Sequence, residues 1–168
     1  MPEPVRVRGD LLDQRVDAIV NAWNRNFIPW WLLVPSGVSG AIKRRGGHQP
    51  FREVRRHGTL RPGQAVVTSA GRLPYKAIIH VAALDTWWRS SATIVATCVR
   101  SALRVAGDQG FASIALPLVG SGTGGVGVDE SLAITESEVR ASDYGGAVIV
   151  VVYPGSPRER RATPARAP

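Results

Sequence analysis

Three short apolar runs constrain the fold of this chain more than any other feature of its sequence. They lie near residues 18–22, 114–119 and 147–153, and apart from Asn21 their residues are continuously apolar rather than alternating with polar ones. Continuous apolar strands are typical of a sheet whose two faces are both covered by helices. Segments with helical spacing separate the runs, so the sequence predicts an α/β layered domain.

Other segments complete the predicted order of elements. A first strand is expected to begin at Val5, and basic residues dominate one or two helices expected from Gly40 to about Arg56. A helix from Ser91 to Ala106 is predicted by apolar residues at helical intervals. The last helix is expected over 129–141 with Asp129 as its N-cap. The remaining strands are expected at 17–24, 64–70, 76–84, 113–120 and 147–153.

Length and charge limit what the chain can be. Its 168 residues fit one domain, and we find no internal repeat. The net charge of +8 favours anionic partners. Residues 154–168 contain four arginines and one glutamate without apolar periodicity, and we expect a disordered basic tail. Such a tail is either simply solvated or in contact with nucleic acid.

No segment predicts a membrane span, a secretory signal or a metal site. The longest apolar run, Ala147 to Tyr153, is too short to cross a bilayer, and no apolar block follows the charged N-terminus, which favours the cytoplasm. The single cysteine, Cys98, cannot form an internal disulfide and is expected inside a helix. His48 and His57 lack the spacing of metal ligands, so we expect neither a metal nor another cofactor.

Two glycine-rich segments are candidates for phosphate binding. GVSGAIKRRGG spans 37–47 before a basic helix, and GSGTGGVG spans 120–127 after a buried strand. Glycines let backbone N–H groups approach an anion, although each segment could also be only a turn or a flexible loop. Neither has the pattern of a nucleoside-triphosphate loop or of a dinucleotide-binding turn. Together they favour a ligand with two linked phosphates.

Five segments in order resemble the macrodomain family. They are GD at 9–10, DAIVNAWN at 17–24, GVSGAIK at 37–43, TSAGRLPYKAIIHV at 68–81 and ALPLVGSGTGG at 115–125. The resemblance covers residues 5–153, and we assign residues 1–153 to one macrodomain. It implies a three-layer α/β/α sandwich with a six-stranded mixed sheet, and a cleft that binds ADP-ribose.

The resemblance also implies a role for each matched position. Asp10 would accept a hydrogen bond from the adenine amino group, unless it caps a helix, and Tyr153 would stack on adenine, unless it only ends its strand. Asn24 would hold the distal ribose and Asn21 would support the loops, which makes them the catalytic candidates; an asparagine there otherwise forms a turn. His80 would be an interior histidine with satisfied hydrogen bonds. Backbone N–H groups would bind the phosphates from Gly37, Val38, Ser39, Gly40, Ala41 and Ile42 in the first loop and from Ser121, Gly122, Thr123, Gly124, Gly125 and Val126 in the second.

The chain departs from the family pattern in three places. Ser39 and Lys43 stand where efficient ester-cleaving members carry an acidic residue and a histidine, although Asp85 or Asp129 could lie near the cleft instead of capping. Residues 25–36 contain an insertion with Trp30 and Trp31, which either bind a ligand or partner or pack against the domain. Many relatives carry an aromatic residue at the place of Gly124, so either the cleft is more open there or the inserted tryptophans replace that ring. Trp87 and Trp88 could form a second aromatic patch nearby.

We therefore expect a domain that binds ADP-ribose and cleaves an ADP-ribosyl linkage on a modified macromolecule, as a mono-ADP-ribosylhydrolase. A non-catalytic ADP-ribose reader is the first alternative, favoured by Ser39 and Lys43. A domain that binds nucleic acid, or removes ADP-ribose from it, is the second, favoured by the net charge and the tryptophans. The partners would be ADP-ribose itself or an ADP-ribosylated protein or nucleic acid.

Overall fold

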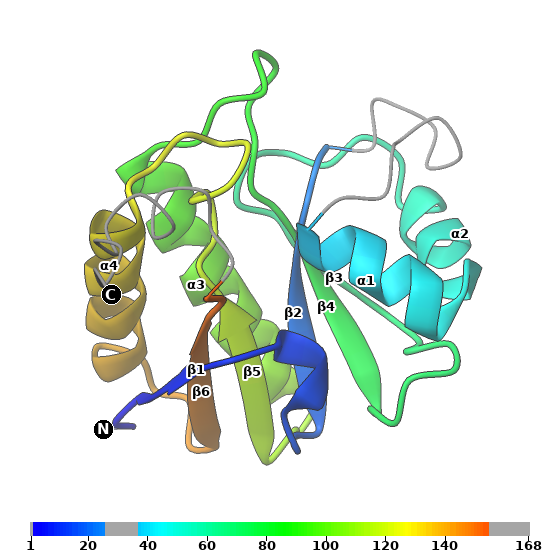
Figure 1. Ribbon diagram of the computed structural model, residues 1–168, viewed down its shortest axis with the longest axis horizontal. Coiled ribbons are helices and arrows are strands. Elements are labelled where there is room, and N and C mark those ends of the chain that lie inside the picture. The colour runs from blue at the N-terminus through cyan, green and yellow to red at the C-terminus, as the bar shows by residue number, and fades with distance from the viewer. Residues whose placement is uncertain (1, 26–36, 155–168) are drawn as a thin grey trace, which may run out of the picture.

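The computed structural model describes residues 2–25 and 37–154 (Figure 1). Two features predicted from the sequence, Trp30 and Trp31 in the insertion and the tail from residue 155, lie outside the described residues. The elements are β1 (Val5–Arg8), the 3₁₀ helix η1 (Leu11–Asp13), β2 (Ala18–Trp23), α1 (Gly37–Gly46), α2 (Gln49–Arg55), β3 (Ala65–Thr68), β4 (Ala77–Ala82), α3 (Ala92–Asp108), β5 (Ser113–Pro117), α4 (Val128–Arg140) and β6 (Ala147–Val152).

The strands form one mixed sheet. Within the described residues it has six strands in the order β1-β6-β5-β2-β4-β3. Neighbouring pairs from β1 through to β4 are parallel, and only β3 runs antiparallel, pairing Thr68 with Ile78 and Ala65 with Val81. The carboxyl ends of five strands therefore meet at one edge, which is where ligands bind in open α/β sheets.

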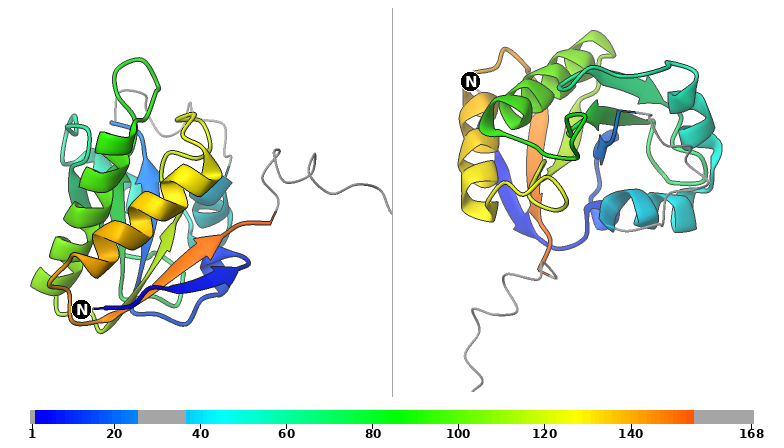
Figure 2. Two further views of the ribbon diagram at one scale, coloured as in Figure 1. Left: turned by 90° about the vertical axis from the view of Figure 1, so that its left-hand side faces the viewer. Right: turned by 90° about the horizontal axis from the view of Figure 1, so that it is seen from above.

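Helices cover both faces of the sheet (Figure 2). Alternate residues of the same strands enter two different cores. Ile19, Ile78 and Ala115 pack with η1, α1 and α2, whereas their neighbours Val20, Ile79 and Leu116 pack with α3 and α4. A strand that must bury side chains on both faces has few polar positions, which explains the continuous apolar runs. The predicted α/β/α sandwich on a six-stranded mixed sheet is confirmed.

Two helix starts differ from the sequence prediction. α1 begins at Gly37 rather than Gly40, so the first glycine segment is the start of a helix and not a loop that precedes one. α4 begins at Val128 with Gly127 as its N-cap, which lacks a side-chain bond, so the predicted cap at Asp129 is wrong. Asp129 instead lies in the first turn, where a carboxylate still interacts favourably with the helix dipole.

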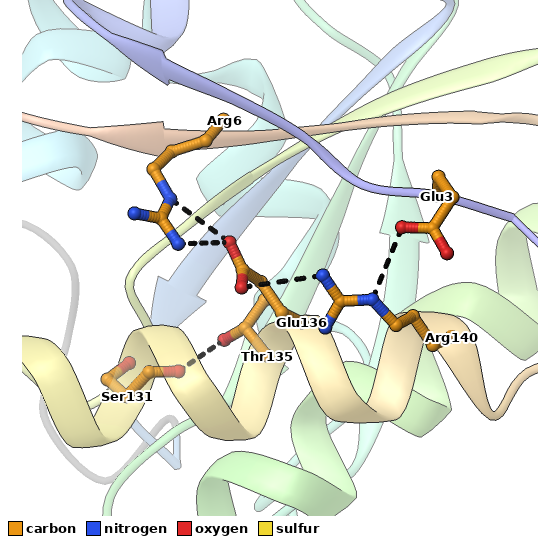
Figure 3. A network of polar contacts seen from close by, with 6 residues as sticks. All are labelled: Glu3, Arg6, Ser131, Thr135, Glu136 and Arg140. Carbon is orange, nitrogen blue, oxygen red and sulfur yellow. Dashed lines mark hydrogen bonds and ion pairs between the residues drawn. The ribbon is translucent and has the colours of Figure 1, made fainter.

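The edge strand β1 is tied to α4 by a network of charged side chains (Figure 3). Arg6 donates two hydrogen bonds to Glu136 Oε1, at 2.8 and 3.1 Å. Arg140 lies 3.7 Å from the other carboxylate oxygen of Glu136 and donates to Glu3 at 3.2 Å. Charged pairs on an exposed edge also hinder pairing with another strand. The network links α4 to the strand that leads into Asp10.

The described residues contain neither a membrane-spanning helix nor a cluster of metal-binding side chains. No helix among residues 2–25 and 37–154 is long and apolar enough to cross a membrane. The same residues contain no group of three or more histidine, cysteine, aspartate or glutamate side chains placed to hold a metal ion.

Candidate functional site

A cleft of about 720 Å³ runs along the carboxyl edge of the sheet. Its walls follow the strand order: Asp10 after β1, Tyr153 after β6, Leu118 after β5, Asn24 after β2 and Leu84 after β4. Four strand spacings of about 4.8 Å give this row of strand ends a length of about 19 Å. A ligand that reaches both ends must therefore be elongated.

The first turn of α1 forms one wall of the cleft. Gly37, Val38, Ser39 and Ala41 line it, and Gly37 has a φ of 54°, which favours glycine. The first N–H groups of a helix have no partners inside the helix, and they attract anions. Ile42 is fully buried in the core, so its side chain has no part in the cleft surface.

The second glycine segment forms the opposite wall with Gly120, Ser121, Gly122, Thr123 and Gly124. In the part of the chain that the structure describes, four of these residues, Gly120 and Gly122 to Gly124, have N–H groups without an acceptor. The N–H of Val126 instead donates to Gly120 O at 3.0 Å, and its side chain is buried in the core. Gly125 and Val126, both predicted to bind phosphate, thus shape the loop and do not line the cleft.

A chain of buried hydrogen bonds lies beneath the cleft. Ser39 Oγ donates to Asn21 Oδ1 at 2.9 Å, and Asn21 Nδ2 donates to His80 Nδ1 at 3.1 Å. His80 therefore carries its proton on Nε2, which donates to Thr68 Oγ1 at 2.9 Å. Burial lowers the pKa of His80 to about 3, so the ring is neutral. The predicted interior histidine is confirmed, and Asn21 supports α1 from below without lining the cleft.

The distal end of the cleft, after β2 and β4, contains a buried cation. Lys43 lines the cleft, and its Nζ lies 5.0 Å from the Phe51 ring and 5.6 Å from the Trp23 ring. Burial lowers the pKa of Lys43 below that of a free lysine. Asn24, also buried, lines the same end. Arg44 is a second cleft cation that the sequence did not single out, because its position on a basic helix also suits a solvated residue.

Acidic side chains contribute less to the described lining of the cleft than basic ones do. Asp10 is the only acidic residue among the described ones that line the cleft, and it lies at the β1 end. It also caps η1, because its Oδ1 accepts from Leu12 N at 2.8 Å. Asp85 Oδ1 accepts from the N–H groups of Trp87 and Arg89, at 2.8 and 2.9 Å, so it caps its own turn. The cleft as a whole favours an anionic ligand.

Aromatic residues stand at both ends. Tyr153 lines the cleft at the β6 end with 62% of its surface exposed, so its ring is available to a ligand rather than packed in the core. Trp88 lines the opposite end and is 38% exposed. The sequence indicated an aromatic patch at Trp87 and Trp88, but not which ring faces the cleft, since that depends on the conformation of the turn.

Comparisons with known proteins agree on one family. A model described as the Macro domain matches residues 20–135. A Macro domain-containing protein of Streptomyces griseus is 42% identical over 142 residues, covering 80% of this chain and 77% of the relative. An O-acetyl-ADP-ribose deacetylase of Enterobacter cloacae is 37% identical over 127 residues, covering 71% of this chain and 67% of that protein.

Solved structures of macrodomains share the fold. A mutant macrodomain of Oceanobacillus iheyensis with ADPR superposes with a TM-score of 0.75 at 27% identity, over 93% of this chain and 87% of that one. The macrodomain of Trypanosoma brucei in complex with ADP-ribose gives a TM-score of 0.74 at 26% identity, over 93% of this chain and 65% of that one.

Proposed function

This chain belongs to the Macro domain family, and from that premise we propose that its cleft binds ADP-ribose along the row of strand ends. The adenine lies between Asp10 and Tyr153, the diphosphate between α1 and the second glycine segment, and the distal ribose beside Asn24. One observation carries the proposal. Two segments with N–H groups that make no bond within their own element, the first turn of α1 and Gly122 to Gly124, line one elongated cleft.

The charges in the cleft support the same ligand. The described lining of the cleft contains two cationic side chains, Lys43 and Arg44, and one carboxylate, that of Asp10. The carboxylate lies at the end assigned to adenine. Asp10 Oδ2 forms only a long ion pair with Arg45, at 4.0 Å, while Oδ1 already accepts from Leu12. One oxygen thus remains to accept a hydrogen bond from an exocyclic amine.

We further propose that the domain releases ADP-ribose from a mono-ADP-ribosylated macromolecule. A water held between a ligand phosphate and the α1 backbone attacks the anomeric carbon of the distal ribose. The bond to the acceptor breaks, and the acceptor leaves with a proton from that water. Asn24 orients the ribose, and Asn21 keeps Ser39 and the first turn of α1 in place. Positioning of this kind lowers a barrier without a dedicated base.

A reader that binds without turnover is the second candidate, and one observation favours it. Among the described residues that line the cleft, none near Asn24 is acidic, so no side-chain carboxylate there can activate the water. The hydroxyl hydrogen of Ser39 is donated to Asn21. The buried Lys43 cannot accept a proton from the water as long as its own amine is protonated.

Calorimetric titration with ADP-ribose, followed by incubation with ADP-ribosylated protein and ADP-ribosylated oligonucleotide, separates these functions. Binding with release identifies a hydrolase and the acceptor that it accepts, including nucleic acid. Binding without release identifies a reader. A wild-type protein that does not bind ADP-ribose refutes both.

The variant Gly122→Glu tests the site itself. A Cβ at Gly122 would meet no atom within 4 Å, so the substitution should not disturb the fold. A carboxylate there would block and repel the diphosphate, and we expect the affinity for ADP-ribose to fall by about 100-fold or more. Gly122→Ala is the matched control and should bind within a few-fold of wild type. Equal affinity in the glutamate variant would place the diphosphate elsewhere.

A further inference from the structure

The turn at residues 85–89 holds one tryptophan at the distal end of the cleft. Asp85 N donates to Arg89 O at 2.8 Å, and the Asp85 carboxylate accepts from two N–H groups of the same turn. Trp88 lies at its tip with a φ of 61°, the only positive φ of a non-glycine residue among the described ones. A bulky residue in this conformation is strained, and such strain persists where the surroundings impose it.

The turn is anchored to both walls of the distal end. On one side Arg25, which directly follows Asn24, donates to Thr86 Oγ1 at 2.8 Å and to Leu60 O at 2.7 Å. On the other side Ser90 N donates to Gly124 O at 2.9 Å. Trp88 is therefore placed by a scaffold that joins the segment after β2 to the second glycine segment.

Gly124 makes this arrangement possible. A Cβ there would lie 2.6 Å from Ser90 Cβ and 2.8 Å from Gly120 O, so no larger residue fits without moving the 85–90 segment. At position 124, the second glycine segment therefore has no side chain that could contact a ligand. Trp88 reaches the same end of the cleft from β4.

We propose that Trp88 is a specificity-determining residue that packs its indole ring on the distal ribose. The inference rests on the proposed function and adds to it the residue that recognises the second sugar. The ring would contact ADP-ribose but not ADP, because ADP ends at the second phosphate and does not reach the β4 end. In this proposal the strained conformation of Trp88 is retained because it places the ring for binding, and not because it stabilises the fold.

Titration of ADP-ribose and ADP against single variants tests this. Trp88→Ala should weaken ADP-ribose binding by about tenfold and leave ADP binding unchanged, since one aromatic contact commonly contributes a factor of this size. Trp88→Phe should restore most of the loss. Trp87→Ala is the matched control, because Trp87 belongs to the same turn, is 81% exposed and does not line the cleft; it should bind both ligands as wild type does.

The variant Trp88→Gly separates binding from folding. Glycine relieves the positive φ, so the thermal unfolding midpoint should hold or rise while ADP-ribose binding falls as in the alanine variant. Equal losses for ADP and ADP-ribose, or no loss for either, would overturn the role of Trp88 while leaving the proposed function intact. The role of Trp88 would also be overturned if the wild-type protein bound ADP and ADP-ribose with equal affinity, because the second ribose would then contribute nothing to binding.

Discussion

Asn21 contributes nothing to the surface of the cleft, yet it determines where Ser39 lies. Its amide is shared between Ser39 and His80; the bond to His80 is buried and the bond to Ser39 is partly buried. Motif positions predicted that Asn21 supports the loops and that His80 is interior. They could not predict the chain of bonds from Ser39 to Thr68, because its members come from α1, β2, β4 and β3 and meet only after the sheet has formed. The ligand-binding roles of Asp10, Asn24 and Tyr153 remain predictions.

The pH dependence of stability tests the buried histidine. The pKa of His80 is about 3 in the folded state against an ordinary value of 6.5, so below pH 6.5 only the unfolded chain takes up this proton. We expect His80 to lower the free energy of unfolding by about 1 kcal/mol as the pH falls from 6 to 5. Urea unfolding across this range should show the slope in wild type and lose it in His80→Gln. The same slope in both proteins would assign the effect to other groups.

At the scale of elements, the strands followed from the apolar runs because burial on both faces leaves a strong signal in a short window. Helix starts were less predictable. The N-cap of α4 is Gly127, which satisfies no N–H with a side chain, whereas Asp129 has the right chemistry in the wrong place. The position of α4 is fixed by tertiary contacts instead. Ser131 Oγ donates to Val119 O at 2.8 Å, which ties the helix to the segment that leads into the second glycine loop.

Ser131→Ala tests this attachment. Ser131 is fully buried, so the variant leaves the Val119 carbonyl without the hydroxyl, and we expect a loss of about 1–3 kcal/mol in the free energy of unfolding. ADP-ribose affinity should also fall, because the loop that supplies N–H groups is less well held. Ser142→Ala is the control: Ser142 follows the end of the same helix, and its partly buried hydroxyl donates to Val139 O only three residues away. Denaturant unfolding should show a clearly smaller loss there.

At the scale of the molecule, the reactivity of the single cysteine measures how completely the core is closed. Cys98 is fully buried in the core between the sheet and the helices α3 and α4, as its apolar neighbours in the sequence predicted. Burial raises the pKa of its thiol to about 12, so almost no thiolate exists at neutral pH in the folded state. The sequence could not supply this value, because it depends on how completely the core excludes water.

Thiol labelling should therefore follow opening of the core. At pH 8 we expect Cys98 to react far more slowly than a free cysteine. Saturating ADP-ribose should slow the reaction further, by about 100-fold at a concentration 100 times the dissociation constant, because the ligand binds only the folded state. Mass spectrometry of the labelled fraction measures both rates, and the Gly122→Glu variant should not respond to the ligand. Labelling at the rate of a free thiol would contradict the buried position.

The row of strand ends also bears on how such a cleft can diverge. β1 and β6 carry one end, β2 and β4 carry the other, and the cores are built mostly from the inner parts of these strands and from the helices. Substitutions at the exposed residues 86–89 after β4 can therefore accumulate with little cost to the fold and without altering the end beside Asp10. Selection can therefore act on the two ends of the cleft independently, so recognition of one half of a ligand can be conserved while recognition of the other half changes.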